Sequence, residues 1–150
     1  MGLDMYLTGR RYVWENNPDS TDSAITEALN KVPNLGHMGK RIKGIEVEAM
    51  YWRKANAIHK WFVENVQDGK DECQEHYVSR EQLYELRDTC LNALYDPDNA
   101  QKYLSPSAGF FFGSTEVDDW YFNALRETIK GLNECLEMDS QWSFYYCSSW

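Results

Sequence analysis

The chain has 150 residues, a formal net charge of −9 and an aromatic content of 15%. The length predicts a single domain over residues 1–150, large enough to bury a core without a disulfide or a metal. The acidic balance argues against general nucleic-acid binding, because such binding needs a basic surface.

Neither the hydropathy pattern nor the cysteines predict a membrane segment or a cofactor. No apolar run approaches the roughly 18 residues that a membrane span needs, and the N-terminus lacks a signal-peptide pattern, so we expect a cytoplasmic protein. The four cysteines form no Cys-x-x-Cys pair and are expected to be reduced. Cys73 and His76 make a single Cys-x-x-His pair, which supplies too few ligands for zinc.

The N-terminal third is predicted to hold strands and one helix. Strand-forming residues at 3–14 predict a strand or hairpin, and turn residues follow at 15–23. Apolar residues at helical spacing from Ala24 onward predict a short helix that Pro33 stops. A loop over 33–40 leads to Ile42, Ile45 and Val47, which are compatible with a second strand.

The rest of the chain is predicted to be mainly helical. Ser79 and Gln82 match a capping box at the start of one helix, and "WSFYYCSSW" predicts a final strand. The fold class is therefore α+β, a small and mainly antiparallel sheet packed against two or three helices. The expected segments are a helix over 48–67, a loop over 70–78, a helix to about 95, a loop over 96–108, a strand over 109–113 and a helix over 116–138.

The stretch "SPSAGFFFGSTEVDDWY", residues 105–121, is the first candidate site. A strand over 109–113 would place Phe110 and Phe112 on one face, and Ser114 and Thr115 would cap the following helix. Carboxylates in that helix's first turn oppose a phosphate site there. The alternative is a pocket wall, in which the Phe rings stack on a flat group, the hydroxyls donate and Asp118 accepts sugar hydroxyls.

The stretch "YWRKANAIHKWF", residues 51–62, is the second. On a helical wheel, Trp52, Asn56 and His59 form one row beside the apolar stripe. The row combines a stacking ring, an amide and an imidazole, although a boundary row under a loop would look the same. No nucleophile motif accompanies His59, so no catalytic residue is predicted.

A basic island surrounds this helix. Residues 40–60 carry Lys40, Arg41, Lys43, Arg53, Lys54 and Lys60 against Glu46 and Glu48, which gives this window a net charge of +4 (six basic minus two acidic residues). Such an island can hold a small anion, or it can be a solvated face.

Three stretches together, "MGLDMYL", "YWRKANAIHKWF" and "SAGFFFGSTEVDDWYF", resemble a family of small bacteriophage and prophage proteins of unknown function. The resemblance covers most of the chain. It brings no activity, and it implies only a phage context, in which small accessory proteins often act against host defence.

These observations lead to one main hypothesis and two alternatives. The main hypothesis is a phage-encoded binding protein that sequesters a small anionic ligand, such as a nucleotide or a nucleotide-derived signal. The first alternative is an acidic inhibitor that docks on a host defence protein, and the second is a nucleotide hydrolase that uses His59. A homodimer through the terminal strands is a further expectation. The predicted ligand-binding residues are Trp52, Arg53, Lys54, Asn56, His59, Phe110, Phe112, Ser114, Thr115 and Asp118.

Overall fold

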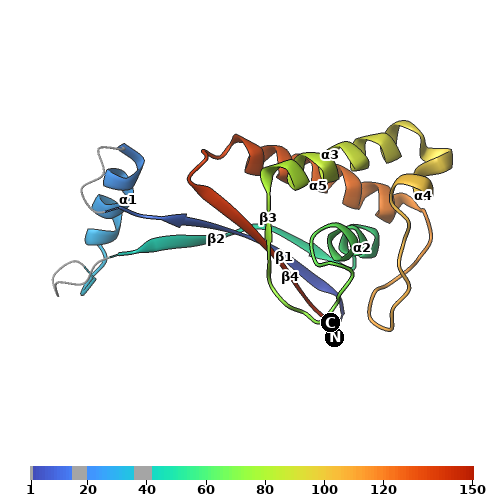
Figure 1. Ribbon diagram of the computed structural model, residues 1–150, viewed down its shortest axis with the longest axis horizontal. Helices are drawn as coiled ribbons and strands as arrows, with labels where there is room; N and C mark the ends of the chain where they lie inside the picture. Colours follow the sequence, from blue (N-terminus) through green and yellow to red (C-terminus); the bar gives the residue numbers. More distant parts are fainter. Residues whose placement is uncertain (1, 15–19, 36–41) are drawn as a thin grey trace.

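The protein has an α+β fold with one sheet and a layer of helices, which confirms the predicted class (Figure 1). The computed structural model describes residues 2–14, 20–35 and 42–150. The strands are β1 (Asp4–Tyr12), β2 (Gly44–Arg53), β3 (His76–Val78) and β4 (Trp142–Ser149). The helices are α1 (Ser20–Asn30), α2 (Asn56–Asn65), α3 (Arg80–Tyr95), α4 (Ala100–Tyr103) and α5 (Asp119–Glu137), with a 3-10 turn, η1, at Pro97–Asn99.

The sheet is antiparallel and its strand order is β2-β1-β4-β3. The first and last strands of the chain therefore pair at its centre, where Leu7 lies opposite Tyr146. Along β1 the odd-numbered residues are buried and the even-numbered ones are partly or fully exposed, because successive side chains of a strand point to opposite faces. The sheet thus has a buried inner face and a wetter outer face.

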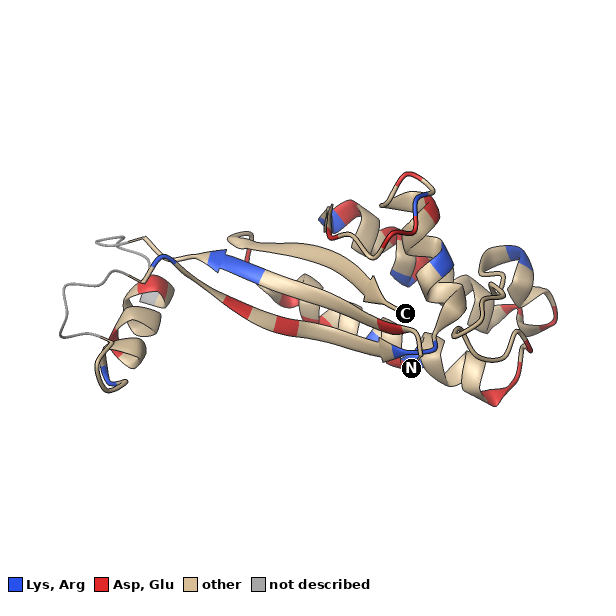
Figure 2. Cartoon of the chain, turned by 90° about the horizontal axis from the view of Figure 1, so that it is seen from below, with Lys and Arg blue, Asp and Glu red and all other residues tan. Residues whose placement is uncertain are grey.

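Helices α2, α3 and α5 cover the inner face. Phe62 of α2 stacks on Tyr146 with ring centroids 3.8 Å apart, and the guanidinium of Arg80, at the start of α3, lies over the ring of Phe144. Helix α5 approaches β2 so closely that a Cβ added at Gly131 would lie 2.4 Å from Cε of Met50. Figure 2 views the sheet from the side away from α3 and α5, where no helix of the described chain covers the strands.

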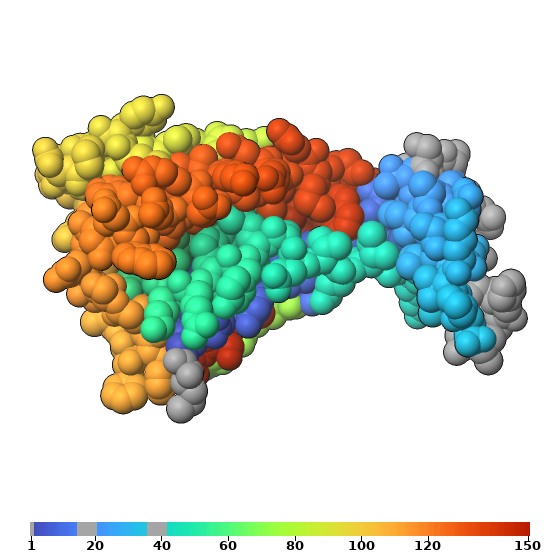
Figure 3. Space-filling model, turned by 180° about the vertical axis from the view of Figure 1, so that it is seen from behind, coloured from blue at the N-terminus to red at the C-terminus, as the bar shows by residue number. Residues whose placement is uncertain are grey.

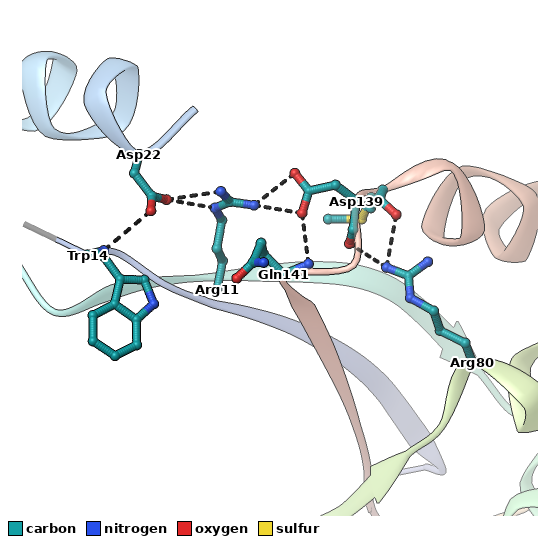
Figure 4. Close-up of polar contacts among 7 residues, drawn as sticks. Arg11, Trp14, Asp22, Arg80, Asp139 and Gln141 are labelled. Carbon is teal, nitrogen blue, oxygen red and sulfur yellow. Dashed lines mark hydrogen bonds and ion pairs between the residues drawn. The ribbon is translucent and has the colours of Figure 1, made fainter. Parts of the chain in front are cut away.

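Helix α1 stands apart from the other helices, at the far end of the β1–β2 ribbon (Figures 1 and 3). The buried guanidinium of Arg11 holds this end together (Figure 4). Its Nη2 lies 2.9 Å from Oδ1 of Asp22 in α1, and its Nη1 lies 2.6 Å from Oδ1 of Asp139 after α5. One side chain of β1 therefore fastens both α1 and the α5–β4 turn.

The predicted helix over 48–67 is wrong in its first part. Strand β2 continues to Arg53, and α2 occupies only Asn56–Asn65. The cause is tertiary: pairing with β1 places Trp52 opposite Met5 on the buried face. Lys54 then turns the chain in a left-handed conformation, with φ of +57°. The apolar stripe that suggested one helix belongs to two elements.

The predicted strand over 109–113 is also wrong. The amide of Phe112 donates to the carbonyl of Gly109 at 3.2 Å, which closes a turn. The Phe112 ring folds back over Gly109, where an added Cβ would lie 2.5 Å from the ring. Phe110, at the tip of this turn, is 95% exposed, so the three phenylalanines do not form a core strand.

Ser114 and Thr115 do not cap α5. Asp118 is the N-cap, because its side chain accepts a hydrogen bond from the amide of Tyr121 at 3.0 Å. Either residue type can cap a helix, and the chain enters this helix three residues later than the sequence suggested.

The other predicted elements agree better with the structure. The final strand is β4, and α1, α3 and α5 lie close to their expected positions. The capping box of Ser79 and Gln82 is present at α3. Short elements inside two predicted loops, β3, η1 and α4, were not predicted. The predicted turn and loop residues 15–19 and 36–40, and with them Lys40 and Arg41, lie outside the described residues.

Candidate functional site

A pocket of about 560 Å³ lies where the end of β2, the start of α2 and the start of α5 meet. In Figure 3 the residues of β2 and α2, drawn in teal and green, border those that lead into α5, drawn in orange. Ile58 and Leu125 are nearly inaccessible and lie at its apolar base. Six of the predicted site residues line it: Trp52, Arg53, Lys54, Asn56, Ser114 and Asp118.

The first wall of the pocket is the start of α2. Its N-cap position is Ala55, which has no side chain that could cap the helix. The first intrahelical donor is the amide of His59, which bonds to the carbonyl of Ala55 at 3.0 Å. The amides of residues 56–58 therefore have no backbone or side-chain acceptor in the described chain, and all three residues line the pocket. Free amides at a helix start carry partial positive charge.

Two cationic side chains stand beside this helix start. Arg53 and Lys54 are exposed and line the same pocket, and no ion pair within the described residues uses either of them. Lys54 keeps its left-handed backbone because its amide donates to the carbonyl of Leu3 at 2.8 Å. A non-glycine residue in this conformation costs free energy, and here the conformation brings a cation to the pocket.

The opposite wall is the start of α5, and it is acidic. Trp120, Asn123, Ala124 and Glu127 form one row of α5 at helical spacing, and all four line the pocket. Glu116 and Asp118 precede them. Tyr121 anchors this wall, because its hydroxyl donates to the carbonyl of Leu104 at 2.6 Å. Burial is the main cause that raises the pKa of Tyr121 to about 12.

The two tryptophans of the pocket differ in how far they are buried. Trp52 is 5% exposed and its indole Nε1 donates to Oγ1 of Thr128 at 2.8 Å, so this ring is fixed in the wall. Trp120 is 83% exposed and has no hydrogen bond or ring partner among the described residues. An exposed indole at a pocket rim can pack against a flat ligand.

Asn56 organises the pocket rather than offering a free amide. Its Nδ2 donates to the carbonyls of Phe112 at 3.0 Å and Ser114 at 2.8 Å. Its Oδ1 accepts the amide of Ser107 at 3.1 Å. Three bonds from one side chain hold the 105–118 segment against α2, which shapes the edge of the pocket.

His59 lies away from this pocket, in the core. It is 1% exposed, and both ring nitrogens are engaged: Nδ1 with the hydroxyl of Tyr146 at 2.7 Å and Nε2 with Oδ2 of Asp71 at 2.9 Å. The neutral ring satisfies both partners if Nε2–H donates to Asp71 and Nδ1 accepts from Tyr146. Burial is also the main cause that raises the pKa of Tyr146 well above its ordinary value.

The remaining predicted residues are divided. Phe110, Phe112 and His59 line a second hollow of about 720 Å³ on the other side of the 105–113 segment, beside Trp150. Thr115 is exposed and lines neither hollow. The structure thus brings the basic residues together with Trp52, Asn56, Ser114 and Asp118, but not with His59 or the phenylalanines.

Sequence reasoning missed the residues that α5 contributes. Trp120, Asn123 and Glu127 were assigned no role, although their spacing of three and four places them on one helix row beside the buried stripe. A tryptophan on the polar side of an amphipathic helix was the available signal. The sequence held no comparable signal for Tyr51 or Glu116. Tyr51 in addition belonged to a wrongly predicted helix.

Several site types receive no support from the described residues. No group of three or more His, Cys, Asp or Glu residues there could hold a metal ion. The four cysteines are free thiols, and Cys73 is exposed. No helix of the described chain has both the length and the apolar character to cross a membrane. Comparison with protein-family models, curated proteins and solved structures finds no match to this chain.

Proposed function

We propose that this protein binds a small anionic ligand that also carries a flat ring and hydroxyl groups, a nucleotide or a nucleotide-derived signal. The observation that carries the proposal is the pairing of two walls in one pocket. One wall has Arg53, Lys54 and the uncapped start of α2, and the other has carboxylates and an exposed indole. A phosphate suits the first wall, and sugar hydroxyls suit the second.

The size of the pocket supports a ligand of this class. Small-molecule sites generally enclose about 300–1,000 Å³ and combine an apolar lining with a few polar groups. The pocket here, at about 560 Å³, falls inside that range. The row of Trp120 and Ala124 on α5 provides apolar surface for the ring.

Binding without turnover is the form that we propose. His59 has both nitrogens occupied and is almost fully buried, so it offers no free base to a substrate. In the phage context that the sequence resemblance implies, such a protein would sequester a signal nucleotide of host defence in the bacterial cytosol.

The test is a thermal-shift and calorimetric titration with AMP, ADP, a cyclic dinucleotide and adenosine. A ligand at 100 times its dissociation constant stabilises the fold by about 2.7 kcal/mol, which raises Tm by about 5–10 °C at this chain length. We expect at least one phosphate-bearing compound to do so and adenosine to do so much less. Equal shifts in Tm with adenosine would refute the role of Arg53, Lys54 and the start of α2 in binding a phosphate. No shift with any of the compounds would refute a nucleotide as the ligand.

The variant Trp120→Ala locates the binding, with Tyr95→Ala as its control. The two rings are equally exposed, at 83% and 84%, but only Trp120 lines the pocket. We expect Trp120→Ala to weaken binding about tenfold, as the loss of one stacking contact implies, and Tyr95→Ala to leave it unchanged. Equal effects would place the ligand elsewhere.

A further inference from the structure

The outer face of the sheet is a second surface, which shares Tyr51 and Arg53 with the pocket. The inference drawn from it is independent of the proposed function. Helices α2, α3 and α5 pack on the inner face, and no described helix covers the outer one (Figures 1 and 2). The nine residues of β1 extend about 30 Å at the ordinary rise of a strand. A surface of this length is large for a small molecule and suits another protein.

Aromatic rings are concentrated on this face. Strand register places Tyr6 beside Tyr51 and Tyr145 beside Tyr77, with ring centroids 5.5 Å and 5.8 Å apart. Tyr51 is 46% exposed and Tyr77 is 58% exposed. Exposed tyrosines in such number are typical of protein interfaces, which favour Tyr, Trp and Arg and contain little Lys. No lysine of the described strands lies on this face.

The charges on the face favour a basic partner. Asp4, Glu46, Glu48 and Glu75 lie there against Arg10 and Arg53, which leaves a net charge of −2 (two basic minus four acidic residues). Figure 2 shows the acidic segments of β2 beside the basic end of β1. Glu46 and Glu75 both bind Arg10, at 2.5 Å and 2.6 Å. Two carboxylates thus surround the single positive charge of Arg10. A second copy of the chain would bring the same excess of negative charge.

The face also contains an example of the contact that a basic partner would make. The guanidinium of Arg10 lies 4.4 Å from the centre of the Tyr145 ring while two carboxylates hold its nitrogens. This combination of a ring face and a carboxylate is what an arginine from another protein needs. Glu48 has no ion-pair partner among the described residues and lies in the same cross-strand row as Tyr145 and Tyr77.

We propose that the outer face of this sheet, centred on Tyr77, Tyr145 and Glu48, docks an arginine-rich surface of another protein. The tyrosine rings receive the guanidinium groups, and the carboxylate of Glu48 neutralises one of them. The centre of the docking surface, at Tyr77, Tyr145 and Glu48, includes no residue that lines the pocket.

The test uses a ten-residue peptide that alternates arginine with valine, and a glutamate–valine peptide of the same length. Amide chemical shifts of the labelled protein are followed during each titration. We expect the arginine peptide to shift amides of β1, β2 and β4 and the glutamate peptide to shift none. The double variant Tyr77→Ser/Glu48→Gln should lower the affinity for the arginine peptide at least tenfold. The control Tyr84→Ser/Glu85→Gln on α3 should change that affinity less than twofold.

Several outcomes would overturn the proposal. Shifts centred on the helices, or equal losses in both double variants, would mean that the peptide follows the overall negative charge. Self-association in sedimentation with shifts on the outer face would assign the face to a second copy. Tighter binding of a ten-nucleotide single strand than of the arginine peptide would make it a nucleic-acid surface. Tyr77→Ser removes a ring from the short β3 and can loosen that strand. The single charge reversal Glu48→Lys leaves every ring in place, so it must also weaken binding of the arginine peptide.

Discussion

Two helix starts face each other across the pocket, and they are built in opposite ways. Helix α5 begins with a carboxylate cap at Asp118 and further acidic residues. Helix α2 begins at Ala55 without a side-chain cap and has Arg53 and Lys54 next to it. A carboxylate cap stabilises a helix start and neutralises it for any anion, whereas an empty cap position leaves the amides available. The difference indicates that α2 gives up local stability where an anion would bind.

The largest effect is expected when the charge at α2 is removed. The double variant Arg53→Gln/Lys54→Asn should lower the affinity for a phosphate-bearing ligand about 100-fold, because each charged hydrogen bond contributes about 1.5 kcal/mol or more. Asparagine tolerates the left-handed backbone of position 54, so Tm should not fall. Calorimetry measures the affinity, and Lys130→Gln on the exposed side of α5 is the control. An unchanged affinity would mean that the basic wall does not bind the phosphate, which contradicts the contrast between the two walls.

At the start of α5, removing the acidic cap should lower the stability of the fold. Replacing Asp118 with Ala removes the hydrogen bond to the amide of Tyr121, and loss of an N-cap costs about 1 kcal/mol. Asp118→Asn keeps the cap and removes the charge, so it should retain stability and bind anions slightly more tightly. Chemical denaturation measures both variants. Equal destabilisation by Asn and Ala would show that charge matters at this position more than the hydrogen bond.

A smaller effect is expected from adding a cap to α2. Ala55→Ser would offer a hydroxyl to the free amides and should raise the free energy of unfolding by less than about 1 kcal/mol. The same hydroxyl would compete with the ligand, so affinity should fall by a few fold. A variant with higher stability and unchanged affinity would mean that these amides do not contact the ligand.

Alkaline pH should loosen the α5 wall through Tyr121. Its pKa is about 12 in the folded protein, against an ordinary value of 10. The unfolded chain therefore releases this proton first, and stability that is complete below pH 10 is lost as the pH rises towards 12. Denaturation at several pH values should show a steeper decline for the wild type than for Tyr121→Phe in this window. Parallel curves would assign the decline to other groups, such as the buried thiol of Cys90, whose pKa burial also raises to about 12.

Local signals in the sequence were sufficient for most of the fold. The capping box at Ser79 and the amphipathic stripe of α5 act within a few residues, so both helices were predicted. The error at 48–53 has a tertiary cause, since only pairing with β1 makes that stretch a strand. The error at Phe110 arose because an apolar triplet resembles a core strand, although a glycine-flanked turn can carry it at the surface.

The candidate site was predictable in part for the same reason. Arg53, Lys54 and Asn56 are neighbours in sequence, so their clustering could be seen without a structure. Their meeting with Asp118 and Trp120 depends on how α5 crosses β2 at Gly131, and a single sequence contains no signal for that crossing. His59 looked like a site residue because an imidazole in a core network and one in a pocket have the same local pattern.

The position of Arg11 has a consequence for how the molecule unfolds. Its guanidinium ties β1 to Asp22 of α1 and to Asp139 at the α5–β4 turn, and α1 stands apart from the other helices in Figure 1. This buried guanidinium therefore couples the folding of α1 to that of β1 and of the α5–β4 turn. Without Arg11, as in Arg11→Met, α1 and the helical body would melt as two separate units, and a single unfolding transition would become two.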